Sequence, residues 1–154
     1  DEEINSAIDA YAQSRDSLYQ EYITEVSATN LAEAEAFLES NKANEGIIIL
    51  PSGCQMSIDS EDEVLGDSPL STDSVVVDYD LFLLDGSQVD GGEGVTFSLQ
   101  NLIPGFTEAV TNMKVGQEAV VYIHPDYGYG ANGSNSIEPN ALLIFRIKLN
   151  SIVK

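Results

Sequence analysis

Few side chains in this chain of 154 residues could carry out covalent or metal chemistry. A single cysteine, Cys54, excludes an internal disulfide, and its sequence neighbours include no histidine or second thiol. We therefore interpret Cys54 as a small strand residue and not as a reactive thiol. The single histidine, His124, makes a histidine-based metal centre or a serine-type triad hard to assemble.

Carboxylates gather between residues 57 and 69, where a calcium site could form. The acidic residues in this segment are Asp59, Glu61, Asp62, Glu63 and Asp67. Their spacing does not match an EF-hand loop, which needs a glycine at its sixth position and a glutamate at its twelfth. We interpret the segment as a solvated acidic loop, and a calcium-dependent surface protein stays as a weaker alternative.

The net charge of the chain restricts its partners. Asp and Glu number 26 against 6 Lys and Arg, so the formal charge is -20. Such a surface repels nucleic acids and gives no direct binding to anionic membranes. An apolar fraction of 43% indicates a folded protein, and no apolar run approaches the about 18 residues of a membrane-spanning helix. The chain begins without Met and shows no signal peptide, so we expect a processed form from which a targeting segment could have been removed.

Residues 1–46 have the pattern of a helical segment. Apolar residues recur at spacings of three, four and seven, namely Ile4, Ile8, Tyr11, Leu18, Tyr22 and Val26. Asn30, with Glu33 three residues later, predicts the start of a second helix, and Gly46 is expected to end it. Two interpretations are open: a helical pair that packs on the rest of the chain, or a dimerisation arm. The short apolar stripe, interrupted at Arg15, favours the first.

Residues 47–154 have the pattern of a mixed α+β domain. β-branched and aromatic runs predict strands at residues 47–50, 54–58, 75–84, 95–99, 118–124 and 141–152. Between Gly105 and Gly116, apolar residues at helical spacing predict one short helix. We therefore expect two parts, a helical N-terminal segment over residues 1–46 and a strand-rich domain over residues 47–154.

Four local patterns, in order along the last 80 or so residues, resemble the FKBP-type peptidyl-prolyl cis-trans isomerases. The patterns are Val75-Val-Val-Asp-Tyr79 with Val89-Asp90, Leu102-Ile-Pro-Gly-Phe106 with Gly116, Ile123-His-Pro-Asp-Tyr-Gly-Tyr-Gly130, and Ile137-Glu-Pro-Asn-Ala141 with Phe145. The join over residues 37–55 resembles the macrophage-infectivity-potentiator branch of that family. In this branch a helical N-terminal part precedes the isomerase domain, and the proteins are commonly exported.

The resemblance implies a twisted antiparallel sheet wrapped around a short helix, with a pocket between them. The residues that would line this pocket are Tyr79, Val89, Asp90, Val95, Leu102, Ile103, Phe106, Tyr129, Ile137 and Phe145. Among them, Phe106 would form the floor, where the family usually has Trp. The Tyr129 hydroxyl and the Ile103 N–H would bind substrate carbonyls, and Asp90 would face the carbonyl carbon or organise neighbouring tyrosines. We assign a second set of apolar residues to the core instead: Phe97, Leu99, Val110, Met113 and Ile147.

The implied activity is rotation of X-Pro bonds in proline-containing polypeptides, which needs no metal or cofactor. The branch further implies an extracytoplasmic location (periplasm or cell envelope), with a lipid anchor and a dimer through the N-terminal helices both left open. Val89 and Val95 stand where the family has bulky aromatic residues, and residues 91–94 lack the Arg that usually pairs with the pocket carboxylate. These departures keep an alternative open: a non-catalytic FKBP-like binding module or chaperone with weak or no isomerase activity.

Overall fold

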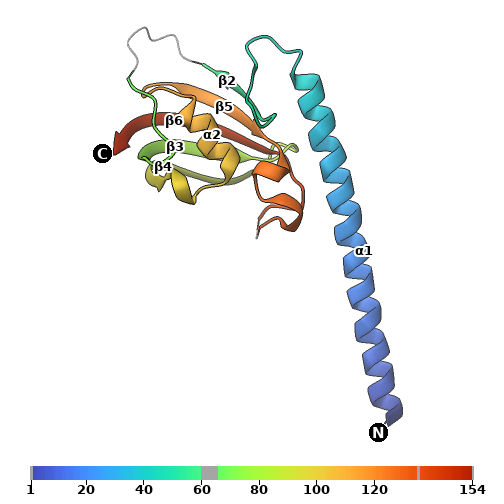
Figure 1. The fold of residues 1–154 in the computed structure, drawn as a ribbon. Coiled ribbons are helices and arrows are strands. Elements are labelled where there is room, and N and C mark those ends of the chain that lie inside the picture. The colour runs from blue at the N-terminus through green and yellow to red at the C-terminus, as the bar shows by residue number, and fades with distance from the viewer. Residues whose placement is uncertain (1, 60–65, 135, 154) are drawn as a thin grey trace.

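The computed structural model describes residues 2–59, 66–134 and 136–153, with side chains from residue 21 on. A long helix, α1 (Glu2–Asn41), precedes an antiparallel sheet with one short helix on its face, as Figure 1 shows. The strands and the short helix are β1 (Ile48–Ile49), β2 (Gln55–Ile58), β3 (Ser74–Phe82), β4 (Gln88–Ser98), α2 (Pro104–Thr111), β5 (Glu118–Ile123) and β6 (Leu143–Val153). Three short 3-10 turns are η1 (Leu99–Asn101), η2 (Pro125–Tyr127) and η3 (Gly130–Asn132). The α+β class and the antiparallel sheet with a short helix on its face, both expected from the sequence, are confirmed.

The sheet has the order β1-β2-β5-β6-β3-β4, and every neighbouring pair is antiparallel. The central strands β3 and β6 pair along their length, from Ser74 opposite Val153 to Phe82 opposite Ile144. Side chains alternate between the two faces of a strand, so every second residue of β6 from Leu143 to Leu149 is buried on the inner face of the sheet. The chain thereby brings residues from β3, β4 and β6 to one face of the sheet, beneath α2.

Helix α2 packs closely on the sheet because its second residue is a glycine. Phe106, Ala109 and Val110 of α2 are buried in the main core. A Cβ atom built on Gly105 would lie 2.5 Å from the Cγ2 atom of Ile123 on β5, which is too close for two carbon atoms. Gly105 therefore sets how near α2 can approach β5, and with it the depth of Phe106.

The expectation of two helices in residues 1–46 was wrong, because α1 is one continuous helix of 40 residues that ends at Asn41. Residues 1–45 contain no Pro or Gly, so nothing in the sequence forces a break, and an Asn within a helix costs well under 1 kcal/mol. The Asn30 side chain does not cap a new helix. Its amide Nδ2 instead donates to the carbonyl oxygen of Pro139 at 3.0 Å.

The C-terminal half of α1 packs against the sheet domain, whereas its N-terminal half extends past it (Figure 1). Ala34 and Leu38 form a small buried cluster with Leu142. The buried Asn41 amide donates to Gln55 Oε1 at 2.9 Å, and Gln55 Nε2 donates to the Leu38 carbonyl at 2.8 Å. These contacts fix the helix to β2 and to the start of β6.

The structure also bears on a metal site and on a membrane-spanning helix. Within the described residues, no group of three or more His, Cys, Asp or Glu side chains could hold a metal ion. Three of the carboxylates of the acidic loop, Glu61, Asp62 and Glu63, lie outside the described residues. No helix in the described part of the chain is long and apolar enough to cross a membrane.

Candidate active site

Four aromatic rings from four different elements surround a pocket of about 230 Å³. The rings are those of Tyr79 on β3, Phe97 on β4, Phe106 on α2 and Phe145 on β6. The Phe106 and Phe145 centroids are 5.2 Å apart with the rings nearly perpendicular, and Phe97 meets Phe106 at 5.9 Å. Such edge-to-face contacts are a preferred aromatic geometry.

Tyr79 closes this cycle of rings. Its centroid lies 5.5 Å from Phe97 and 6.4 Å from Phe145, so each of the four rings contacts two others. Phe106 is 3% exposed and Phe145 is 4% exposed, so these two rings form the floor of the pocket. We call the four rings the aromatic cup. Their mutual contacts make it a rigid apolar surface, of a kind suited to a small apolar ring.

Three groups of the same pocket can form hydrogen bonds. The Tyr129 side chain lines the pocket and is 37% exposed, and the Asp90 carboxylate lines it from β4. Ile103 lines it just before α2, and its carbonyl accepts from the N–H groups of Phe106 and Thr107 at 3.1 and 3.3 Å. Among the backbone hydrogen bonds of the described residues, none uses the Ile103 N–H, so this donor is available to a ligand.

The Asp90 carboxylate is held by its neighbour and lies beside Tyr79. Its Oδ1 accepts from the Gly91 N–H at 2.8 Å, and the carboxylate is near enough to the Tyr79 hydroxyl to affect the pKa of Tyr79. Burial raises the pKa of Tyr79, and the negative charge of Asp90 raises it further. Tyr79 therefore stays a neutral hydroxyl donor at neutral pH. Among the described residues Asp90 makes no ion pair, which agrees with the missing Arg noted in the sequence.

Seven of the ten expected lining residues meet in the pocket: Tyr79, Asp90, Leu102, Ile103, Phe106, Tyr129 and Phe145. The other three do not line it. Val89 is packed against the core, Val95 faces Gly92 within β4, and Ile137 is buried in the core with 7% exposure. Sequence reasoning missed Asn101, and it assigned Phe97 to the core alone, whereas Phe97 also forms a wall of the pocket.

Phe97 could have been found from the strand pattern. Val95 and Phe97 are two residues apart on β4, so their side chains share a face of the sheet. The same alternation that placed Val95 at the site applies to Phe97. The larger ring reaches the pocket, and it supplies the aromatic wall that the valines at positions 89 and 95 were expected to leave absent.

A second hollow, of about 180 Å³, lies on the outer face of the sheet and is lined mostly by charged residues of β3, β5 and β6. The Asp78 carboxylate there accepts from the Gly94 N–H at 2.7 Å and from the Asn150 amide at 3.0 Å. The bond from Gly94, and then that from Asn150, lowers the pKa of Asp78. These bonds link Gly94 of β4 and Asn150 of β6 to Asp78 of β3, so Asp78 has a structural role here.

Cys54 is buried directly before β2, where burial raises the pKa of its thiol. The thiolate is the reactive form, so this cysteine is unreactive at neutral pH. That position agrees with its interpretation as a small buried residue.

Comparison with known proteins places this fold and pocket in a family. The family model for the FKBP-type peptidyl-prolyl cis-trans isomerase matches residues 66–150, and that for the domain amino terminal to it matches residues 1–58. The chain is 39% identical over 130 residues to "Outer membrane protein MIP" of Legionella longbeachae, covering 81% of this chain and 55% of that protein. It is 35% identical to the FKBP-type peptidyl-prolyl cis-trans isomerase FkpA of Aeromonas hydrophila, covering 100% of this chain and 58% of that protein.

A solved structure agrees with these matches. The crystal structure of FkpA from Escherichia coli superposes with a TM-score of 0.91 at 29% identity, covering 99% of this chain and 72% of that one. The chain spans only about half the length of the curated relatives it matches. Its match to both family models nevertheless shows that the chain belongs to the FKBP-type peptidyl-prolyl cis-trans isomerases, in the branch that includes Mip and FkpA.

Proposed function

We propose that this chain catalyses cis-trans rotation of X-Pro bonds in polypeptides and thereby assists protein folding. The observation that carries the proposal is the aromatic cup, with three hydrogen-bonding groups at its rim. It offers an apolar seat for a proline ring and donors for the carbonyl groups on either side of it. The membership of the chain in the isomerase family supports the same reaction.

The reaction suits a pocket without a nucleophile. The peptide C–N bond has partial double-bond character, and its rotation barrier is about 18–20 kcal/mol. Charge separation stabilises the planar amide, and the twisted transition state has less of it. An apolar cup therefore disfavours the planar state relative to the twisted one, which is what acceleration requires. No bond breaks, so no metal or cofactor enters the proposed mechanism.

The polar groups at the rim would hold the chain around the twisting bond. In the proposal, the Ile103 N–H and the Tyr129 hydroxyl each donate to a substrate carbonyl oxygen. The Asp90 carboxylate, held by the Gly91 N–H, faces the carbonyl carbon. Hydrogen bonds that are better formed in the twisted state than in the planar state lower the barrier.

A peptide assay with a matched pair of variants tests the proposal. The chain should accelerate cis-trans relaxation of a short Xaa-Pro peptide well beyond the uncatalysed time of about 10–100 s. Tyr129→Phe should lower kcat/KM by roughly two- to tenfold, since it removes one donor to a carbonyl. Tyr127→Phe, two residues away and outside the pocket lining, is the control and should leave kcat/KM unchanged. No acceleration at micromolar protein would refute the proposal.

An aggregation assay, run beside the peptide assay, distinguishes the non-catalytic alternative from the enzyme. A binding module or chaperone would suppress aggregation of unfolded proteins in a manner that survives Tyr129→Phe and Asp90→Ala, without peptide isomerisation. The structure gives this alternative less support than the sequence did. Phe97 supplies an aromatic wall, and the departures at Val89 and Val95 lie outside the pocket lining.

We further propose an extracytoplasmic location and a dimer formed through α1. The Legionella longbeachae relative is named "Outer membrane protein MIP", which supports the location. Fractionation of cells that express the full precursor would test it, and recovery with cytoplasmic markers would refute it. The projection of the N-terminal half of α1 beyond the sheet domain supports a dimer. Sedimentation equilibrium should give twice the chain mass of 16.6 kDa, and a single-chain mass would refute the dimer.

A further inference from the structure

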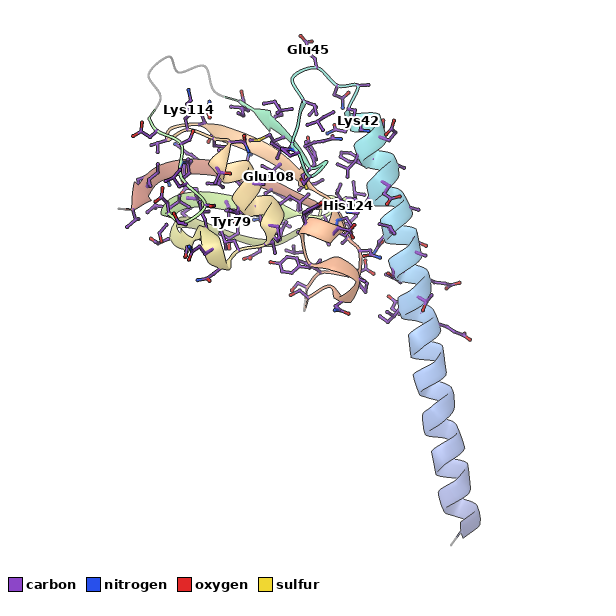
Figure 2. The ribbon with its side chains drawn as sticks, in the orientation of Figure 1. Lys42, Glu45, Tyr79, Glu108, Lys114 and His124 are labelled. Atoms are coloured by element: carbon purple, nitrogen blue, oxygen red, sulfur yellow. The ribbon has the colours of Figure 1, made fainter. Side chains whose placement is uncertain are left out.

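Helix α1 contacts both ends of the segment that carries Tyr129. This segment, residues 124–140, leaves β5, forms the turns η2 and η3, and returns toward β6 along the side of the domain that faces α1 (Figure 1). At its start, His124 lies on the side of the domain next to α1 (Figure 2). Its Nε2 is 3.5 Å from Glu35 Oε1 of α1. At its end, the Asn30 amide donates to the Pro139 carbonyl at 3.0 Å.

Asn140 links α1 to the backbone beside Tyr129. Its side-chain Nδ2 donates to the Ser27 hydroxyl oxygen at 2.7 Å and lies 3.4 Å from the Ser27 carbonyl oxygen. Its backbone N–H donates to the Gly130 carbonyl at 2.8 Å. A path of two hydrogen bonds thus runs from Ser27 on α1 through Asn140 to the residue that follows Tyr129.

The backbone conformation of Asn140 is part of this link. Asn140 has a φ of 56°, and it is the one non-glycine residue with positive φ in the described chain. Asn tolerates this left-handed conformation better than most residues. Here it combines that conformation with a side chain long enough to reach α1, which glycine could not supply.

Within the segment, the backbone beside Tyr129 is held by the Gly133 N–H, which donates to the Tyr129 carbonyl at 3.2 Å and lies 3.3 Å from the Gly130 carbonyl. Gly128 and Gly130 flank Tyr129, and the turns η2 and η3 are only three residues each. The Tyr129 side chain is more than a third exposed, so packing alone holds it weakly. A donor that must meet a substrate carbonyl needs its position held within about 0.5 Å. The contacts with α1 add to the restraint that the internal hydrogen bonds of the segment supply.

We infer that α1 is a positioning element for Tyr129, acting through Ser27, Asn30 and Asn140 as positioning residues. The inference rests on the proposed isomerase function for its kinetic test. These residues touch neither the pocket nor the substrate. They fix the backbone at residues 130 and 139–140 so that the Tyr129 hydroxyl is already oriented when the substrate binds.

The first experiment measures kinetics in α1 variants of the full chain. Ser27→Ala and Asn30→Ala should each lower kcat/KM for a short Xaa-Pro peptide by about two- to tenfold, as expected for loss of one hydrogen bond. The loss should appear mainly in kcat. Ser27→Thr keeps the hydroxyl and should restore the rate. Lys42 directly follows α1 and makes an exposed ion pair with Glu39 of that helix, so Lys42→Ala is the control and should leave the rate unchanged.

A double-mutant cycle shows whether the effect passes through Tyr129. In a Tyr129→Phe background, Ser27→Ala should lower kcat/KM by much less than it does in the wild type, because the hydroxyl that it positions is absent. An equal loss in both backgrounds would overturn the inference. So would rates for Ser27→Ala and Asn30→Ala that match the Lys42→Ala control.

Amide hydrogen exchange tests the link independently of catalysis. The N–H groups of Asn140, bonded to Gly130, and of Gly133, bonded to the Tyr129 carbonyl, should exchange faster in Ser27→Ala than in Lys42→Ala. If the wild type proves inactive, the proposed function fails, and the exchange result still decides whether α1 holds this segment. Unchanged exchange at both amides would overturn the inference.

Discussion

Replacing Gly105 with alanine should displace α2 and disturb the floor of the pocket. The added Cβ would lie 2.5 Å from Ile123 Cγ2 and 3.0 Å from Ile123 Cγ1, whereas carbon atoms in contact prefer about 3.5–4.0 Å. The helix or the isoleucine must therefore move by roughly 1 Å. Phe106 is the next residue along α2 and forms the floor of the aromatic cup. The movement should thus reach the candidate site directly.

Two opposing terms set the size of the effect. Overpacking a well-packed core costs typically about 1–3 kcal/mol. Replacing a helical glycine with alanine gains at most about 0.5–1 kcal/mol. The packing term is the larger, so we expect the free energy of unfolding to fall by about 1–2 kcal/mol. For a chain of this length, each kcal/mol lowers Tm by about 2–4 °C.

A double-mutant cycle with Ile123→Ala provides the assay. Ile123→Ala alone removes the three atoms that the new Cβ would meet, and should cost about 2–5 kcal/mol as a cavity. In that background Gly105→Ala should be neutral or stabilising. Unfolding in urea gives the four free energies, and kcat/KM of the same proteins reports on the pocket floor. Stabilisation by Gly105→Ala alone, or an equal cost in both backgrounds, would refute the reasoning.

Three titratable groups give further predictions. The pKa of Asp78 in the folded state lies below 3.8, so its carboxylate should stabilise the fold above pH 3.8, and this contribution should be lost as the pH falls through the folded-state pKa. Asp78→Asn should therefore make the free energy of unfolding depend less on pH in acid. An unchanged dependence on pH would contradict this prediction. Tyr79 has a raised pKa, so its contribution is complete below pH 10.0 and lost at higher pH. Spectroscopic titration should find it ionising after an exposed tyrosine, which Tyr79→Phe would identify; ionisation at or below 10.0 would argue against the contact with Asp90. The Cys54 thiol should react with a thiol reagent only as fast as the protein opens, and rapid labelling of the native protein would show that it is not buried.

Most strand positions could be predicted from the local sequence pattern. The exceptions depend on contacts between strands, which a local pattern does not contain. The predicted strand at residues 95–99 is the end of β4, which begins at Gln88. Gly91 and Gly92 are poor strand formers, so nothing local predicts a strand there. They extend the strand because β3 lies alongside, with Asp80 opposite Gly91 and Tyr79 opposite Gly92.

Helix α1 shows the same limit for helices. Asn30 and Glu33 have the local signature of a helix start, but the chain continues straight through them. The Asn30 amide finds its partner at Pro139, 109 residues away, and no local pattern contains that contact. A capping residue favours the start of a helix only weakly, and a contact with a distant residue can outweigh that preference.

At the candidate site, the family resemblance supplied the residues and the fold supplied their arrangement. Seven expected residues lie together although they come from β3, β4, α2 and β6 and from the segments before α2 and after β5. Phe97 was misassigned because a core residue and a pocket wall look alike in sequence, since both face inward from a strand. Which inward residue borders an open volume depends on how α2 sits over the sheet, and Gly105 sets that distance.

The central claim is that the aromatic cup seats proline and lowers the barrier to rotation of the bond before it. The most direct measurement is NMR exchange between the cis and trans forms of an Xaa-Pro peptide at equilibrium, with wild type and with Phe106→Ala at equal concentration. The wild type should raise the exchange rate severalfold or more, and Phe106→Ala, folded but without the pocket floor, should abolish most of the increase. Exchange at the uncatalysed rate with the wild type, or full catalysis by Phe106→Ala, would contradict the claim.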